Sequence, residues 1–298
     1  MRTGWRWVTE LGLGVLRARG ADARSFLQGQ LSNDTTRLHS GQLQLSGYHS
    51  PQGRAIALLR LTPLAPDDLL AVLPLELVPV VVARLKRYVL RAKVQITDDS
   101  AAWQILGSTL PPPGLPAGAL SLPYGSTRSL VLIPQAAGPW AAVVDGTRSD
   151  WLACDIAEGL PQVYLATSEA FVAQMLNLDV TDGIALDKGC YTGQEIIARA
   201  HYRGHVKRRM QRFVSTDPCA LEPGQTGTLG DGRGFRVVEA VATAQGRSEF
   251  LAVTNPAPGA EAALTEHPED AAAMPSATQV ILAARQLPLP YDLPDQGP

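Results

Sequence analysis

Cysteines are few in this sequence and lie far apart. Only three occur among 298 residues, Cys154, Cys190 and Cys219, and no two of them form a CxxC pair. A disulfide framework needs more cysteines, and a closed zinc or iron–sulfur site within one chain needs paired ligands. We therefore expect a reducing compartment, the cytoplasm, and no metal site.

Long apolar runs and a strong overall charge are also missing. No run reaches the ~18 apolar residues that suggest a membrane span, and the N-terminal stretch MRTGWRWVTELGLGV lacks the apolar core of a secretory signal. Charged residues make up 18% of the chain and the net charge is −2. We expect no membrane partner and no affinity of the chain as a whole for nucleic acid.

Residue patterns predict a mixture of helices and strands, an α+β fold. Helices are expected after Asp22, up to about Tyr88, and from Trp151 to Gly159. Residues 47–61 have the pattern of a strand, a turn at Pro51–Gly53 and a second strand.

The later part of the chain is richer in proline, glycine and short strands. Residues 108–126 are expected to form mainly a surface loop, followed by strands within 129–146. Short strands between 227 and 254 predict a small β-domain, which a Pro/Ala-rich insert at 255–277 interrupts. The Pro-rich tail from residue 287 is expected to run extended over the surface.

Positive charge gathers in one segment. Residues 187–212 contain seven Lys or Arg and two acidic residues, a local charge of +5. Such a patch attracts a polyanion or a ligand with carboxylates; a solvated surface is the alternative. The patch is expected to include Arg203, Lys207, Arg208 and Arg209.

The same segment contains a cysteine close to a predicted helix start. Thr192 and Glu195 fit a capping box, which places Cys190 two residues before the helix. The helix N-terminus and Lys188 both favour a thiolate. A cysteine that only packs in a tight turn is the alternative.

Other chemistry is less favoured at this place. A hydrolase would need a histidine oriented on Cys190, and no flanking signature indicates one. His201 and His205 have metal-ligand spacing on a helix, but Gly204 between them disfavours that helix. Trp151 is either a core residue or a stacking platform for a planar heterocycle.

The segment KGCYTGQE at 188–195, followed by ARAHYRGHVKRR, resembles the signature of the YgfZ family, folate-binding relatives of the aminomethyltransferase (T-protein) of the glycine cleavage system. Further resemblance follows in family order through GADARSFLQGQLSND at 20–34, SPQGR at 50–54, KRYVLRAKVQI at 86–96, AEGLP at 157–161 and LPYD at 289–292. The resemblance covers nearly the whole chain.

The resemblance implies a three-lobed ring around a central folate channel. The first lobe would comprise residues 1–46 and 150–205. A ferredoxin-like second lobe would comprise residues 47–149, and a C-terminal β-barrel residues 206–298. The implied cofactor is tetrahydrofolate or a one-carbon derivative.

The resemblance also implies functional residues. Cys190 would be the reactive thiol, and Trp151, Tyr191 and Arg199 would bind folate. The signature residues with a structural role are Lys188, Gly189, Thr192, Gly193, Gln194 and Glu195. The implied partners are folate and iron–sulfur enzymes or their assembly factors, including enzymes that modify tRNA, with any tRNA contact expected to be indirect.

Two departures from the family pattern bear on function. A second folate-facing tryptophan of the family matches a position near Leu13, where this sequence has no aromatic residue, and Trp5 or Trp7 would have to substitute. The acidic residue that aminomethyltransferases carry after the GR turn is replaced by Ala57 and Leu58.

We therefore predict a folate-binding protein that supports iron–sulfur enzymes. A folate-dependent aminomethyltransferase or demethylase is the first alternative, and the missing acid disfavours it because a positioned acid or base contributes roughly 10²–10⁴-fold. A scaffold that binds folate without chemistry is the second. A direct RNA binder is a third, for which only Tyr202 and Phe213 lie among the basic residues of the segment.

Overall fold

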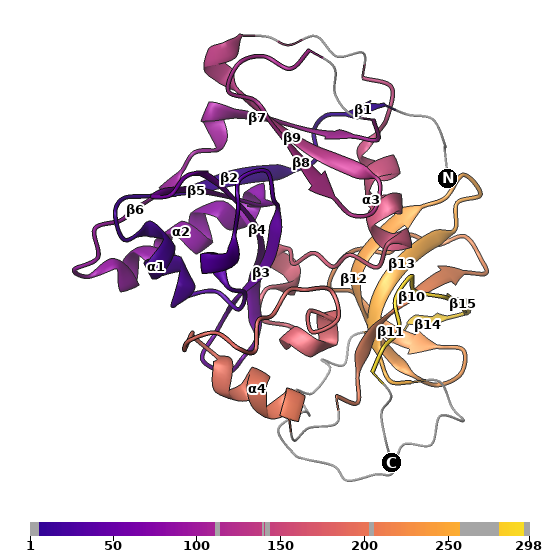
Figure 1. Ribbon diagram of the computed structural model, residues 1–298. Helices are drawn as coiled ribbons and strands as arrows, with labels where there is room; N and C mark the ends of the chain where they lie inside the picture. The colour runs from indigo at the N-terminus through magenta and orange to yellow at the C-terminus, as the bar shows by residue number, and fades with distance from the viewer. Residues whose placement is uncertain are drawn as a thin grey trace.

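The computed structural model describes residues 6–110, 114–138, 140, 144–202, 206–256 and 280–294. Their strands form three separate sheets of five, four and six strands (Figure 1). Residues 148–202 form short helices and loops. They follow the last strand of the four-stranded sheet in sequence and precede the first strand of the six-stranded sheet. The fold is therefore mixed α and β with several sheets.

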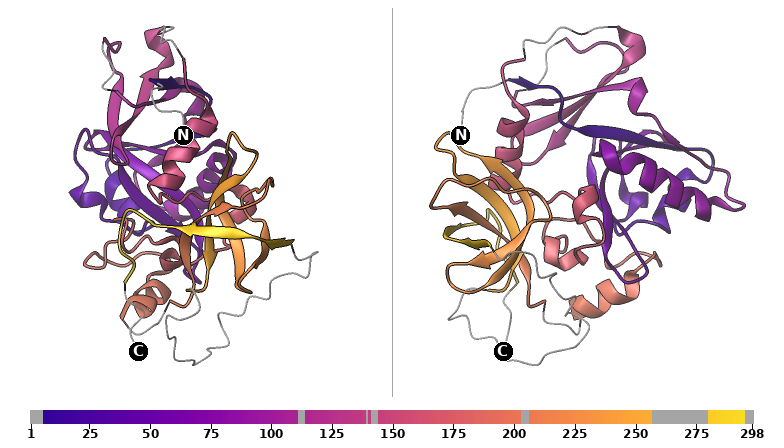
Figure 2. Two further views of the ribbon diagram at one scale, coloured as in Figure 1. Left: turned by 90° about the vertical axis from the view of Figure 1, so that its right-hand side faces the viewer. Right: turned by 180° about the vertical axis from the view of Figure 1, so that it is seen from behind.

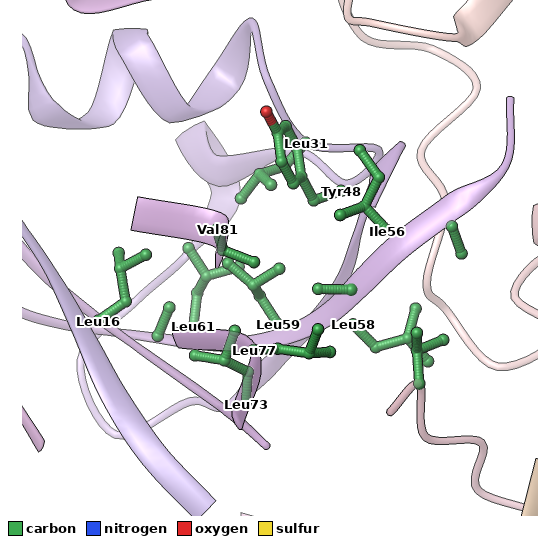
Figure 3. Close-up of a cluster of buried hydrophobic side chains, with 14 of the residues drawn as sticks. Leu16, Leu31, Tyr48, Ile56, Leu58, Leu59, Leu61, Leu73, Leu77 and Val81 are labelled. Carbon is green, nitrogen blue, oxygen red and sulfur yellow. The ribbon is translucent and has the colours of Figure 1, made fainter. Parts of the chain in front are cut away.

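The five-stranded sheet contains most of the core. Its strands are β2 (Leu13–Arg19), β3 (Gln44–His49), β4 (Ala55–Ala65), β5 (Asp68–Pro74) and β6 (Gln95–Asp98), in the order β3-β4-β5-β2-β6. Helices α1 (Ala23–Gln28) and α2 (Val78–Val89) accompany it. Figure 3 shows the leucines of β4 and β5 meeting Val81 of α2 in one apolar cluster.

The spacing of valines explains how α2 packs. Val78, Val81, Val82 and Leu85 are buried and recur at intervals of three and four residues, which places them on one helix face. Pro79 stands in the first helical turn, where its missing N–H costs no hydrogen bond. The other side of α2 is exposed to solvent, and near the C-terminal end of the helix it carries Lys86 and Arg87.

The four-stranded sheet has the order β1-β7-β9-β8, with β1 (Trp7–Val8), β7 (Trp103–Ser108), β8 (Leu120–Tyr124) and β9 (Arg128–Pro134). Helix α3 (Arg148–Ala157) packs Trp151 against it. A Cβ atom on Gly107 would lie 2.4 Å from Cζ3 of Trp151, so the indole ring rests directly on the backbone of β7.

The six-stranded sheet is nearly closed. Its strands are β10 (Arg209–Ser215), β11 (Thr226–Leu229), β12 (Gly234–Ala242), β13 (Ser248–Thr254), β14 (Val280–Leu282) and β15 (Ala284–Leu287), in the order β14-β11-β12-β13-β10-β15. The two edge strands, β14 and β15, are separated in sequence by Ala283 alone. The edges of the sheet must therefore approach each other, and the sheet curls into a barrel-like shape (Figure 2).

The remaining elements are short. Helix α4 (Gln194–Tyr202) follows the loop-rich segment after α3. Single 3-10 turns are η1 (Thr35–Arg37), η2 (Leu75–Leu77), η3 (Ser100–Ala102), η4 (Gln135–Ala137), η5 (Leu165–Thr167) and η6 (Ala173–Leu176). Within the described ranges, no helix is both long and apolar enough to cross a membrane.

Most predicted elements are present, with two corrections. The Pro/Gly-rich stretch 108–126 was expected to be mainly loop, yet Leu120–Tyr124 form β8. Pro123 is tolerated there because β8 is an edge strand, whose free side needs no N–H donor. The predicted strand at 140–146 is also not formed by the residues described there, 140 and 144–146, and residues 141–143 lie outside the described ranges, as does the predicted insert at 255–277 from residue 257 on.

The lobe boundaries stay a prediction. Strand β2, which belongs to the predicted first lobe, pairs with β5 and β6 of the predicted second lobe.

Replacing Gly107 by alanine should destabilise the fold, because the new methyl group meets the Trp151 ring in a filled core. We expect the free energy of unfolding to fall by roughly 1–3 kcal/mol, measured by urea denaturation. Gly234→Ala is the control, since its Cβ would meet nothing closer than 4.0 Å. Equal stability of the two variants would show that Trp151 does not rest on β7.

Candidate functional site

Lys188 anchors the signature segment in the protein interior. Its Nζ donates hydrogen bonds to the backbone oxygens of Gln28, Leu31 and Asn33 at 2.7, 2.6 and 2.8 Å. An ammonium has three protons to donate, so all three are used. Burial lowers the pKa of Lys188 to about 8, with Asp34 acting in the opposite direction. The signature is thereby tied to the turn that follows α1.

The loop before Lys188 is attached to the same turn. Ser32 Oγ donates to the carbonyl of Gly183 at 2.6 Å, and the Ala185 N–H donates to the carbonyl of Ser32 at 3.0 Å. The Asn33 side-chain amide donates to the carbonyls of Leu45 and Asp182. The bonds to Gly183 and Asp182 join residues about 150 positions apart in sequence and fix the loop at 181–188.

A second contact sets the signature against the β3–β4 hairpin. Gly193 has φ +83°, and a Cβ atom there would lie 2.5 Å from the Ser50 carbonyl oxygen and 3.1 Å from Cα of Gly53. A Cβ on Gly53 would in turn lie 3.0 Å from Ile196. The two glycines therefore let the TGQE and SPQG segments touch backbone to backbone.

Helix α4 starts close to the predicted place but with a different hydrogen bond. The prediction paired Thr192 with Glu195. The structure begins the helix at Gln194, whose Oε1 accepts from the Tyr191 N–H at 3.3 Å. The hydrogen bond joins residues i and i+3, as predicted for Thr192 and Glu195, but lies one position earlier in the sequence. Gly193, in its left-handed conformation, turns the chain at this point.

A cavity of about 750 Å³ lies beside the anchored loop. It is bounded by the residues before and in β3, by β4, by β8, and by the loop at 181–187. Polar and aromatic residues of its wall include Asn33, Arg37, Gln44, Arg60, Tyr124 and Asp187. Its size is within the ~300–1,000 Å³ typical of small-molecule sites.

Arg60 is the buried cation of this cavity. Its side chain lies 6% exposed in the apolar strand β4 and donates one hydrogen bond to the carbonyl of Pro161 at 3.3 Å. The guanidinium carbon is 4.9 Å from the centre of the Tyr124 ring. No carboxylate in the described part of the chain forms an ion pair with it. Arg60 therefore retains donors for an anionic or carbonyl-bearing ligand.

At the more open side of the cavity, Arg37 lies between two carboxylates. Its guanidinium contacts Asp34 at 3.1 Å and Asp187 at 2.5 Å. The hydrogen bond from Arg37 holds the pKa of Asp187 below its usual range. Asp187 therefore stays ionised, and the pair joins η1 to the loop that leads into the signature.

Gln44 offers an acceptor without a partner. Its amide nitrogen donates to the Asp34 carbonyl at 2.9 Å, which sets the orientation of the amide. Its Oε1 atom is buried and has no hydrogen-bond partner among the described residues. A buried acceptor of this kind favours a ligand with N–H groups.

Trp151 lies one layer behind the cavity. Its ring is 2% exposed and stands 4.8 Å from that of Tyr124, which does line the cavity. The guanidinium of Arg128 lies 4.4 Å from the indole and pairs with Asp155 at 2.7 Å. In this structure Trp151 is a core residue that supports Tyr124.

The segment at 187–212 is less uniformly exposed than its charge suggests. Arg209 is 6% exposed and binds Asp179 through two hydrogen bonds of 2.9 and 2.7 Å. Arg212 pairs with Glu249. Arg199 and Arg208 are exposed, Lys207 is partly buried, and Arg203 lies outside the described residues.

Cys190 is exposed, whereas Cys154 and Cys219 are partly buried. Burial raises the pKa of Cys154, which disfavours reaction there, and exposure favours reaction at Cys190. Activation of the Cys190 thiol by Lys188 stays a prediction. The Lys188 ammonium donates its hydrogen bonds to three carbonyls of the turn after α1. No group of three His, Cys, Asp or Glu in the described ranges is arranged to hold a metal ion.

The structure brings only part of the predicted site together. Trp151, Tyr191 and Arg199 are not among the residues that line the described cavity; Tyr191 packs against Lys188, with Nζ 5.0 Å from its ring. Sequence reasoning missed Arg60, Arg37 and Tyr124. A single arginine within the apolar run AIALLRL was a usable signal for Arg60, because unpaired buried charges are rare. Nothing local marked the other two.

The sequence left Trp7 as one substitute for the aromatic residue missing near Leu13. It is buried in a different cluster, where it meets Trp140 edge to face with ring centres 4.7 Å apart. Leu13 and Trp103 both pack against the cluster that contains Trp151. Trp5 lies outside the described residues.

Comparison with known proteins gives consistent relatives. No protein-family model matches the chain. A tRNA-modifying protein YgfZ from Enterobacter sp. strain 638 is 30% identical over 267 residues, covering 79% of this chain and 81% of the relative. An uncharacterized protein from Haemophilus influenzae is 34% identical over 200 residues, covering 67% and 70% of the two chains.

A solved structure shares the fold. The glycine cleavage system aminomethyltransferase T from Bartonella henselae superposes with a TM-score of 0.65 over 84% of this chain and 78% of the other. The two sequences are 13% identical, so the likeness concerns the fold alone.

Gly193→Ala should destabilise the protein more than Gly189→Ala. Alanine at position 193 adds left-handed backbone strain, roughly 1–2 kcal/mol, to a clash with the Ser50 carbonyl. A Cβ on Gly189 meets nothing within 4 Å, so that variant is a matched control within one signature. Urea denaturation measures both. The hairpin contact is refuted if the variant at 193 is as stable as its control.

His49 should make stability depend on pH. The side chain is 1% exposed, and burial lowers its pKa from 6.5 to about 4. As pH falls below 6.5, the unfolded chain binds the proton first, so the free energy of unfolding decreases until about pH 4. The expected loss is about 3 kcal/mol.

The variant His49→Leu should remove this part of the pH dependence, while the exposed residue His39 serves as control in His39→Leu. Urea titrations from pH 4 to pH 8 compare the three proteins. Parallel stability curves for the wild type and His49→Leu would contradict the prediction.

Proposed function

The chain belongs to the YgfZ family, and from this membership we propose that it binds a tetrahydrofolate in the cavity at Arg60 and supports iron–sulfur enzymes, among them enzymes that modify tRNA. The printed names of its relatives, tRNA-modifying protein, support the link to tRNA. The fold shared with an aminomethyltransferase supports a folate as the ligand class.

The observation that carries the proposal is the cavity itself. It has a volume of about 750 Å³ and combines the aromatic ring of Tyr124 with the cation of Arg60. A folate has a planar heterocycle, amide groups and carboxylates. The buried ring of Tyr124 gives the wall an aromatic group beside Arg60, and Arg60 offers donors for the carbonyl of the heterocycle or for a carboxylate.

The polar groups of the wall also suit this ligand. Gln44 presents a buried oxygen without a partner among the described residues, which an N–H of the heterocycle would satisfy. Arg37 is held by Asp34 and Asp187 at the exposed side, where carboxylates of a glutamate tail would enter. Each group is placed by the anchored turn after α1 or by the loop at 181–187.

Cys190 is the residue proposed for chemistry. It is exposed and lies three positions after Asp187, which lines the cavity. A bound tetrahydrofolate supplies one-carbon or reducing chemistry, and the thiol supplies a nucleophile beside it. Arg199 and Arg208, both exposed, remain proposed contacts for the glutamate tail or a partner.

Full aminomethyltransferase activity is less well supported. Ala57 and Leu58 in β4 are both 0% exposed, so the strand gives the cavity no carboxylate at that place. Asp68 is the second acidic residue after Leu58 in the sequence. It pairs at 2.6 Å with Arg17 of the neighbouring strand β2. The carboxylates that do line the cavity, Asp182 and Asp187, come from the loop before the signature.

The three-lobed ring is part of the same proposal. The predicted first lobe, the ferredoxin-like second lobe and the C-terminal barrel would surround the folate, and the cavity has walls from β3, β4 and β8 that belong to two different sheets. The arrangement of the three lobes as a ring around the folate rests on membership of the family.

Calorimetric titration with tetrahydrofolate tests the proposal. We expect binding by the wild type and at least a tenfold weaker affinity for Arg60→Gln, since loss of a hydrogen bond to a charged group costs about 1.5–3 kcal/mol. Cys190→Ser is the matched variant. It should bind folate normally and fail to support the activity of a tRNA-modifying iron–sulfur enzyme in a deletion strain.

Two outcomes would count against the proposal. Unchanged affinity of Arg60→Gln would place folate elsewhere, and Trp151→Phe would then be the next variant to measure. Full support of the client enzyme by Cys190→Ser would leave a folate-binding scaffold without thiol chemistry.

A further inference from the structure

A basic surface lies at the C-terminal end of α2, far in sequence from the signature. Residues 77–97 contain five Lys or Arg and no Asp or Glu, a local charge of +5. We name the exposed part of it, Lys86, Arg87, Tyr88 and Arg91, the α2 surface. Figure 1 and the right panel of Figure 2 place α1 and α2 at the end of the molecule opposite the six-stranded sheet.

The cations of the α2 surface are not neutralised by the fold. Arg84, one turn earlier, pairs with Glu169 at 2.6 Å. Within the described ranges, Lys86, Arg87 and Arg91 have no ion-pair partner, and each is exposed. Asp22 contacts this segment through a hydrogen bond that its carboxylate accepts from the backbone N–H of Lys93. Three positive charges therefore face solvent together.

Apolar groups are exposed among these charges. The Tyr88 side chain is 48% exposed and Leu90 is 89% exposed. Leu90 has φ +41° and ψ −100° at the end of the helix, a conformation that costs a non-glycine residue of order 1–3 kcal/mol. An aromatic ring and an aliphatic side chain are thus exposed next to the cations, and Leu90 contributes almost no burial to the fold.

Helix stability explains only part of this arrangement. Cations in the last turn interact favourably with the partial negative charge of a helix C-terminus, which accounts for Lys86 and Arg87. It does not account for Arg91, which lies beyond the helix, nor for the exposure of Tyr88 and Leu90. These residues are arranged as a surface for a partner with negative charge and planar, stackable groups.

We propose that the α2 surface binds RNA, with Lys86, Arg87 and Arg91 on backbone phosphates and Tyr88 stacked on an unpaired base. An acidic protein would match the charge but would not need an exposed aromatic ring among the cations, whereas stacking on aromatic side chains is a general feature of single-stranded RNA recognition. The inference goes beyond the proposed function, since folate binding requires no RNA contact. Only the choice of tRNA as probe rests on that function.

The test is fluorescence-polarisation binding of unfractionated tRNA over a range of salt concentrations. At about 0.1 M salt, Arg87→Gln/Arg91→Gln should bind roughly 10- to 60-fold more weakly than the wild type, and the slope of log K against log salt should flatten by about 0.7–0.9 per lost contact. Arg247→Gln/Arg285→Gln removes two exposed arginines of the barrel-like sheet and is the matched control. It should bind like the wild type.

Variants of Tyr88 separate stacking from charge. Tyr88→Ala should weaken binding about fivefold or more, and Tyr88→Phe should retain it, because the ring supplies the stacking energy. Poly-L-glutamate of equal charge should compete poorly with tRNA. Circular dichroism confirms that each variant is folded, and tetrahydrofolate titration of the double variant should be unchanged, which keeps this test independent of the folate cavity.

Three results would overturn the inference. The first is a wild type that does not bind tRNA. The second is equal weakening by the control pair, or no weakening by the double variant. The third is full competition by poly-L-glutamate together with an unaffected Tyr88→Ala, which would identify a surface for acidic proteins instead.

Discussion

The candidate site depends on the burial of one ammonium group. Lys188 donates to three carbonyls of the turn after α1, and so holds together two segments about 155 residues apart. Asn33, which accepts one of these bonds, also lines the cavity, as does Asp187 next to the lysine. The hydrogen bonds of Lys188 therefore hold two walls of the cavity together. Glycine contacts at the β3–β4 hairpin fix the other end of the signature.

Local sequence patterns predicted most of the fold. The helix ending near Tyr88, the turn at Pro51–Gly53 and the short strands of the C-terminal region each depend on residues close together in the chain, and each prediction is confirmed. The Pro-rich stretch that contains β8 was misjudged, because whether Pro123 is tolerated depends on the strand being at an edge, which is a property of the whole sheet.

The site was predictable only in part, because its contacts join residues that are far apart in the sequence. The signature was recognisable, but the direction of Lys188 depends on carbonyls from another part of the chain. Charge counting placed Arg209 in an open patch, whereas Asp179 pairs with it in the interior. Arg60 and Tyr124 meet across two sheets, and their contact has no local pattern. Conversely, the basic run of α2 is visible in the sequence, and only the structure shows which of its cations lack partners.

The most direct test of the account is a crystal structure of the protein with tetrahydrofolate. The account predicts electron density for the heterocycle against the ring of Tyr124, a hydrogen bond from the Arg60 guanidinium, and a Lys188 ammonium still bonded to the turn after α1. A folate stacked on Trp151 after displacement of Arg128, or bound at α4 with the cavity empty, would contradict it.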